Sequence, residues 1–338
     1  MAELIGYISK EARQVGNALL TGRDIFIGFK KEKHKPNMFQ SVTLVGLSAL
    51  IPEDVKASGI LKNPARISAI NAIEQYIVVL NDRIDFEGSG RQDIGDLIRP
   101  IHDLERSRRV ELDQALVVLP ENEQEWVRRN TETAISEIEF VEAWIREKQE
   151  TNNISFSDVD SYRATVNAVY EVAGSSVIFG PGHLQDRVTP NEGQMNIQKV
   201  IDKYAWLSGT QPRNEIERAM MASHNMLMAM QIIDDRAGVD IDQLLKVPTY
   251  AIVALRVSEG DKKSARTLLN LKEKEYKEKA VELGAGLGGG EVVLRAFALA
   301  EAVLNRLPAI GRRHAWARRV LEKRHFGMRE KAYMDKKI

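Results

Sequence analysis

Cysteine is absent from this chain of 338 residues, which excludes disulfide bridges and thiolate metal sites. A surplus of one charge is also absent, because 48 basic side chains balance 48 acidic ones. This balance argues against a protein that binds nucleic acid through bulk electrostatics. No apolar run reaches the ~20 residues of a membrane span, and residues 1–20 mix charges into their apolar positions, unlike a signal peptide. We therefore expect a soluble cytoplasmic protein with no transmembrane segment and no nucleic-acid partner.

Strand-like alternation of useful length is missing as well. Apolar residues instead recur at helical spacing along most of the chain, as at Ile135, Ile138, Val141 and Ile145. We expect helical structure over residues 93–150, 159–179 and 214–235, with Ser157 or Asp158 as the cap of the second of these. Trp126 and Trp144 are expected to pack in the core. With 43% hydrophobic residues, the chain can form a sizeable core, and a helical domain of this length can be single. We predict an all-α, single-domain fold over residues 1–310, followed by a basic C-terminal tail over residues 311–338.

One stretch, residues 226–242, combines a methionine-rich apolar helix pattern with four aspartates, Asp234, Asp235, Asp240 and Asp242. At ~3.6 residues per turn, Asp234, Gly238 and Asp242 share a helix face, and the glycine leaves room beside the two carboxylates. Carboxylates at the end of a buried helix are costly unless a positive group joins them. Hard cations with oxygen ligands suit such a site. A polar C-terminal turn that faces water is the alternative interpretation.

This stretch is the second of two acidic segments in chain order, and the first acidic segment lies upstream with the same layout. An apolar helix over residues 65–80 ends in Asn81-Asp-Arg-Ile-Asp85, and Asp82 and Asp85 share a helix face. Glu87 and a flexible stretch, residues 88–91, follow. If the two helices face each other, both acidic segments point into one cavity.

Two further stretches have competing interpretations. Residues 30–36 form a basic loop, which is either a solvated run of charge or a set of ammonium groups that holds an anion. Residues 284–290 are rich in glycine but lack the Lys-Ser/Thr of a phosphate loop and connect two helices, so we interpret them as a linker.

Taken in order, these pieces resemble the trans-isoprenyl diphosphate synthase family, within the class I terpenoid synthases. Lys33-His-Lys-Pro36 is similar to the basic element that grips the homoallylic diphosphate, and residues 81–85 look like the first aspartate-rich motif, with Arg91 behind it. Residues 231–235, from Gln231 to Asp235, look like the start of the second motif, and the segment beginning at Lys246 is similar to the Lys-Pro-Thr segment that follows it. The resemblance covers roughly residues 30–260.

The chain departs from the family pattern at several positions. Asn81 replaces the first aspartate of the first motif, and Gly238 stands at the third aspartate of the second motif. The Lys-Thr pair of the middle helix has no clear counterpart and aligns roughly with Asn167-Ala168. The spacing of Asp234, Gly238 and Asp242 also resembles the second metal motif of terpene cyclases.

The resemblance implies a bundle of antiparallel helices around a central cavity. It further implies a magnesium-dependent enzyme, a homodimer, that ionises an allylic prenyl diphosphate and transfers the prenyl cation to a second isoprenoid unit. Up to about three Mg²⁺ ions would bind to the enzyme through its carboxylates and the substrate diphosphate. The implied catalytic residues are Asp82, Asp85, Asp234 and Asp235, and Gly238 and Asp242 join them in the metal site. The implied diphosphate-binding residues are Lys33, Lys35, Arg91 and Lys246.

Two alternatives stay open. A class I terpene cyclase would use the same metal chemistry on a single prenyl diphosphate. A non-catalytic subunit of a heteromeric prenyl synthase would tolerate the departures from the two aspartate-rich motifs.

Overall fold

The computed structural model describes residues 64–88, 95–179, 195–245 and 247–290, together with residues 50, 184, 293 and 294. These residues form helices and no strand, as the sequence predicts. The elements in chain order are α4 (Pro64–Gly88), α5 (Gly95–Val117), α6 (Glu121–Glu150), α7 (Phe156–Phe179), α9 (Ile197–Tyr204), the 3₁₀ turn η3 (Ala205–Ser208), α10 (Glu215–Leu245), α11 (Tyr250–Val257) and α12 (Lys262–Ala285). None of the described helices is both long enough and apolar enough to cross a membrane.

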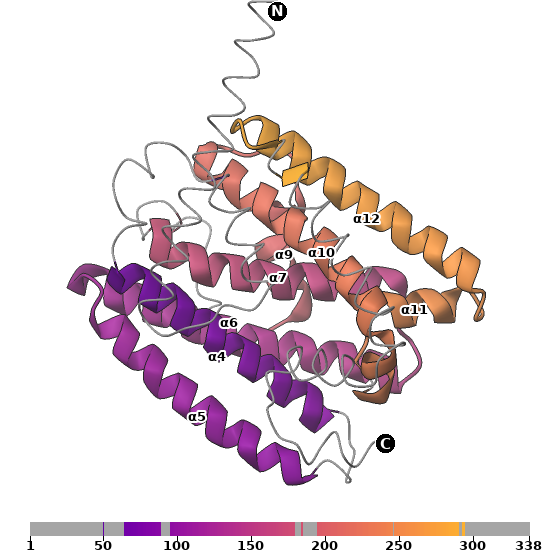
Figure 1. The fold of residues 1–338 in the computed structure, drawn as a ribbon, viewed down its shortest axis with the longest axis horizontal. Coiled ribbons are helices and arrows are strands. Elements are labelled where there is room, and N and C mark those ends of the chain that lie inside the picture. Colours follow the sequence, from indigo (N-terminus) through magenta and orange to yellow (C-terminus); the bar gives the residue numbers. More distant parts are fainter. Residues whose placement is uncertain are drawn as a thin grey trace, which may run out of the picture.

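The long helices lie side by side in the order α5, α4, α7, α10 and α12, with α6 packed against α4, α5 and α7 (Figure 1). Helix α7 therefore has α4 on one side and α10 on the other. Its central place follows from its sequence, because Tyr162, Val169 and Val177 are fully or almost fully buried. Two contacts fix α4 against it: the Arg66 guanidinium donates to the Val177 carbonyl at 2.6 Å, and the Tyr170 hydroxyl donates to a carbonyl of α4 at 3.4 Å.

Helix α7 begins earlier than the sequence suggests. Ser157 or Asp158 is the expected cap, yet the helix starts at Phe156 and Ser155 occupies the capping position. The Asp158 amide donates to Ser155 Oγ at 3.1 Å, and the Ser155 amide donates to Asp158 Oδ2 at 2.8 Å. This reciprocal pair is a capping box, in which the acidic residue stands three positions after the cap. The expected cap is thus wrong, and Asp158 serves as the other half of the box.

Helix α10 also differs from expectation. The sequence suggests that this helix ends near Asp235, but it continues for ten residues, to Leu245. The second acidic segment consequently lies within a helix and is not a polar C-terminal turn. Similarly, α4 extends through Glu87 to Gly88, and residues 93–150 divide into α5 and α6 at the turn that ends in Pro120.

The core draws on every long helix. Trp126 and Trp144 pack against it, as the sequence analysis predicts for the two tryptophans. The methionines of α10 are buried at 2% exposure or less, namely Met220, Met221, Met226, Met228 and Met230. These side chains belong to the hydrophobic core of the bundle.

Candidate functional site

The first acidic segment lies in the last two turns of α4, against α6. Asp85 accepts a hydrogen bond from Arg146 Nη2 at its Oδ1, with the two atoms 2.7 Å apart. The Asn81 amide donates to the other oxygen of Asp85 at 3.3 Å. Both members of the ion pair are largely buried, with side chains 14% and 13% exposed. The first segment is therefore held to α6 by a charge-assisted contact.

A second carboxylate, Glu142 of α6, lies close to Asp85. Burial and the neighbouring Glu142 charge raise the pKa of Asp85 to about 7, against the lowering effect of Arg146 and Arg163. Glu142 is fully buried and accepts a short hydrogen bond from the Tyr162 hydroxyl. Burial, followed by the Glu142 charge, raises the pKa of Tyr162 well above its ordinary value.

The second acidic segment lies in α10, against α7 and the start of α11. Asp235 is 2% exposed and forms an ion pair with Arg163 of α7 at 3.2 Å. The same oxygen, Oδ1, accepts a hydrogen bond from the side-chain amide of Gln231 at 2.6 Å. The other oxygen of Asp235, Oδ2, accepts a hydrogen bond from the backbone amide of Tyr250 at 2.9 Å. Asp235 thus joins α7, α10 and the first residue of α11, whose amide would otherwise need a cap.

Arg163 relates the two segments to each other. It forms the ion pair with Asp235, and its charge also lowers the pKa of Asp85. Since α4 and α10 both pack against α7, the described aspartates of both segments lie within the electrostatic reach of one guanidinium.

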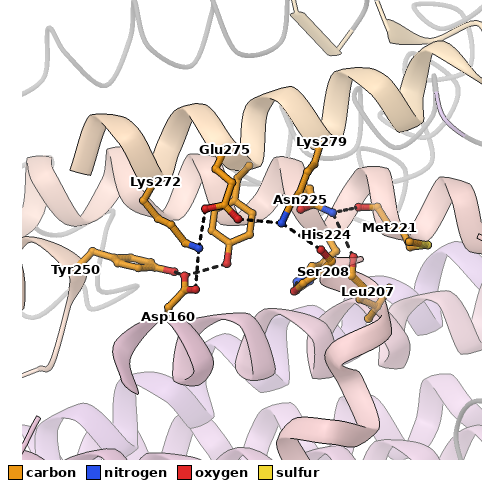
Figure 2. A network of polar contacts seen from close by, with 11 residues as sticks. Asp160, Leu207, Ser208, Met221, His224, Asn225, Tyr250, Lys272, Glu275 and Lys279 are labelled. Atoms are coloured by element: carbon orange, nitrogen blue, oxygen red, sulfur yellow. Dashed lines mark hydrogen bonds and ion pairs between the residues drawn. The ribbon is translucent and has the colours of Figure 1, made fainter. Parts of the chain in front are cut away.

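A further polar network extends from α7 to α11 and α12 (Figure 2). Asp160 accepts hydrogen bonds from the Tyr250 hydroxyl at 2.5 Å and the Tyr276 hydroxyl at 2.9 Å, and it forms an ion pair with Lys272 at 2.9 Å. Burial raises the pKa values of both phenols, and the Asp160 charge adds to the effect. Tyr250 therefore contacts Asp235 through its backbone and Asp160 through its side chain.

Through Glu275, which pairs with both Lys272 and Lys279, the same network reaches a buried histidine in the N-terminal half of α10. Ser208 Oγ lies 3.0 Å from His224 Nε2, and Lys279 Nζ donates to the Ser208 carbonyl at 3.4 Å (Figure 2). Burial lowers the pKa of His224 to about 3, with a smaller effect from Lys279. The imidazole is consequently neutral near pH 7. These contacts join η3 to α10 and α12.

Several of the expected site residues cannot be compared with the prediction. Asp82, Asp234, Gly238 and Asp242 lie within α4 and α10, but nothing beyond their backbone is described. The expected diphosphate-binding residues lie outside the described residues, namely Lys33, Lys35, Arg91 and Lys246. The N-terminal segment and the tail over residues 311–338 also lie outside them.

Three charged residues of this region, Glu142, Arg146 and Arg163, are not among the site residues expected from the sequence. A signal for them is present in the sequence. Glu142 and Arg146 stand four apart on a helix whose apolar positions are buried. Arg163 directly follows the buried Tyr162 in α7. Charges at such positions need an opposite charge nearby, because burial of an unpaired charge is costly.

The fit of Asp85 and Asp235 to a magnesium ion depends on their oxygens and their charge. Each of the two carboxylates accepts hydrogen bonds at both oxygens, and each is paired with an arginine. Among the side chains that the structure describes, no group of three or more carboxylates or imidazoles could hold a metal ion. In this arrangement the oxygens of Asp85 and Asp235 take part in ion pairs and hydrogen bonds within the protein.

The chain matches no protein-family model, no curated protein and no solved structure. The resemblance to the isoprenyl diphosphate synthases therefore rests on the motifs of the chain and on their order.

Proposed function

We propose that this chain is an isoprenoid synthase that ionises an allylic prenyl diphosphate and transfers the prenyl cation to a second isoprenoid unit. The observation that supports this most is the relationship of both acidic segments to Arg163. One segment contributes Asp235, which pairs with Arg163. The other contributes Asp85, whose pKa is raised by burial and by Glu142, and the charges of Arg146 and Arg163 oppose this rise. The expectation of two acidic helices around one site is consistent with their packing on either side of α7.

The bundle is the second support. We propose that it is an isoprenoid synthase-like arrangement of antiparallel helices around a central cavity. Its central helix α7 lies between α4 and α10, the two helices that carry the acidic segments.

The magnesium part of the proposal rests on Asp82, Asp234 and Asp242, whose helical spacing comes from the sequence. Magnesium bound with a diphosphate supplies positive charge to the departing phosphate oxygens. Asp85 and Asp235 have a different role: through Arg146 and Arg163 they hold the two acidic segments against α6 and α7. Ion pairs in such a largely buried place fix the positions of helices, since separating them leaves a buried charge.

A substrate panel tests this function. The purified chain is incubated with labelled allylic diphosphates of several lengths, with and without isopentenyl diphosphate and with Mg²⁺ or EDTA, and the products are identified by mass spectrometry. Longer diphosphates are the expected products. Hydrocarbons or alcohols formed from a single diphosphate would assign the chain to the terpene cyclases instead.

The basic loop provides a second test of chain elongation. Replacement of Lys33 and Lys35 by alanine is expected to raise the Michaelis constant for isopentenyl diphosphate and to leave that for the allylic substrate unchanged. Equal effects on both constants, or no effect on either, would argue against a homoallylic site in this loop.

A non-catalytic subunit of a heteromeric synthase is the second candidate. The observation that favours it is the pairing of Asp85 with Arg146 and of Asp235 with Arg163, which balances the charge of two of the expected metal ligands. Product formation by the chain alone would exclude this candidate. Product that appears only after a partner chain is added would support it.

We also propose that the chain forms a homodimer. Helix α5 has three exposed valines on or beside its outer face, Val110, Val117 and Val118, which are 54–59% exposed. Their burial against a second copy would remove apolar area from water. Light scattering on the wild-type chain and on Val110→Glu measures this directly, and a wild-type monomer would contradict it.

A further inference from the structure

Arg146 occupies an unusual place at the end of α4. It projects from α6, its side chain is 13% exposed, and its Nη2 donates to Asp85 Oδ1 at 2.7 Å. The guanidinium lies against the last turn of α4, where unpaired carbonyls give the helix a partial negative charge. A cation at this point is favourable even before its carboxylate partner is counted.

Gly88, the last residue of α4, leaves room for this guanidinium. A Cβ atom at Gly88 would lie 2.3 Å from Arg146 Cζ, 2.4 Å from Nη1 and 2.5 Å from Nε. These distances are far below van der Waals contact. Any larger residue at position 88 would therefore require the guanidinium, the far end of a flexible side chain, to move, whereas glycine lets it lie directly over the backbone. Gly88 is exposed, so this edge of the guanidinium is close to solvent.

Most hydrogen-bond donors of Arg146 are unused. A guanidinium has five N–H donors in a planar fork, and the described residues accept only one hydrogen bond from Arg146, at Asp85. Its Nε is buried and has no hydrogen-bond partner, and the nearest oxygen, Oε2 of Glu142, is 3.9 Å away, beyond hydrogen-bond distance. If Arg146 had only to balance Asp85, a lysine would suffice, because it supplies the same charge at a single point.

We propose that Arg146 binds a phosphoryl group: while it keeps its contact with Asp85, its free N–H groups donate to the oxygens of a diphosphate. The planar fork of arginine suits two oxygens of a phosphate, which is why arginine is favoured at such sites. Gly88 is the residue that makes the site accessible. The identity of the ligand as a prenyl diphosphate rests on the proposed function, but phosphoryl binding by Arg146 can be measured without it.

The test is calorimetric titration with inorganic pyrophosphate and with a prenyl diphosphate, each in Mg²⁺ and in EDTA. For Arg146→Gln we expect a Kd at least about tenfold weaker for both ligands. Arg146→Lys should lie between that variant and the wild type, because one ammonium cannot form the two parallel contacts of a guanidinium. Arg129→Gln is the matched control: it removes an arginine from the same helix, one that is 60% exposed and paired with Glu125, and it should leave both Kd values unchanged.

Gly88→Ala separates binding from charge. It retains every charged group but forces the guanidinium to move, so we expect it to weaken pyrophosphate binding nearly as much as Arg146→Gln. Thermal melting identifies any variant that fails to fold. If one of Arg146→Gln and Gly88→Ala does not fold, the pyrophosphate Kd of the other variant decides whether Arg146 binds the ligand. If folded Arg146→Gln or Gly88→Ala binds pyrophosphate as tightly as the wild type, Arg146 has only a structural role.

The two proposals fail in different ways. A wild-type chain that binds pyrophosphate but no prenyl diphosphate would contradict the isoprenoid function and leave the Arg146 site standing. A wild-type chain that makes prenyl products, with unchanged kinetics and Kd values in Arg146→Gln, would leave the function standing and overturn the site. A wild-type chain that binds neither ligand would overturn both.

Discussion

Arg163 of α7 and Asp235 of α10 form an ion pair of 3.2 Å in which the carboxylate is 2% exposed and the guanidinium 11% exposed. The two residues are far apart in the sequence but adjacent in the fold, because their helices pack along each other. Removal of one partner leaves the other charge buried and unpaired, which strongly lowers the free energy of unfolding.

Arg163→Gln is expected to lower the free energy of unfolding by about 3–5 kcal/mol, since Asp235 would lose its cation. The double variant Arg163→Gln/Asp235→Asn should regain a substantial part of this loss, because it leaves no buried charge. Urea unfolding of the two single variants and the double variant gives the coupling energy. A coupling near zero would mean that the pair is not formed in solution.

Asp160→Ala should loosen α11 and α12 from α7. The substitution leaves two buried phenol groups and the Lys272 ammonium without their shared acceptor. We expect a loss of about 3 kcal/mol, from one charge-assisted contact and two unsatisfied donors. Hydrogen exchange should report faster exchange in α11 and α12 than in α5, which has no contact with this network. Uniform acceleration over all helices would contradict the local role.

His224 makes folding stability depend on pH in the acidic range. Burial lowers its pKa to about 3, below the ordinary value of 6.5, so the unfolded chain binds the proton more readily than the folded one. The contribution of His224 to the free energy of unfolding is fully present above pH 6.5. It is lost as the pH falls towards 3, by at most about 1.4 kcal/mol per pH unit. Replacement by glutamine should remove this slope from urea unfolding data. The same replacement at His102, which is 43% exposed, serves as the control.

Glu171 has the opposite pH dependence. It is buried between α7 and α10 with two serine hydroxyls as partners, Ser223 at 2.8 Å and Ser175 at 3.4 Å, and burial raises its pKa to about 7. The folded state therefore holds the proton more tightly, so the contribution is present below pH 4.5 and is lost as the pH rises through 7. We expect Glu171→Gln to unfold at higher urea concentration than the wild type at pH 8. If Glu171→Gln stabilised the chain against urea more at pH 4 than at pH 8, the raised pKa of Glu171 would be contradicted.

The sequence alone determined the helical architecture. The spacing of apolar residues in α7 is a local property, set by the helical repeat, and it predicted this helix to within a few residues. Helix ends were less predictable: Ser155 forms the cap where Ser157 or Asp158 was expected, and α10 continues past Asp235. At each of these ends several residues could cap or continue the helix, and the hydrogen bonds that decide are formed only in the fold.

The partners of the aspartates were decided only by the tertiary structure. Asp85 is 61 residues from Arg146 in the chain, and Asp235 is 72 residues from Arg163, so no local pattern associates them. The sequence shows the carboxylates but not the guanidinium groups that neutralise them, because the choice of partner depends on which helices pack together and on which faces meet. Packing of α4 against α6, and of α10 against α7, converted aspartates that resemble metal ligands into members of buried ion pairs.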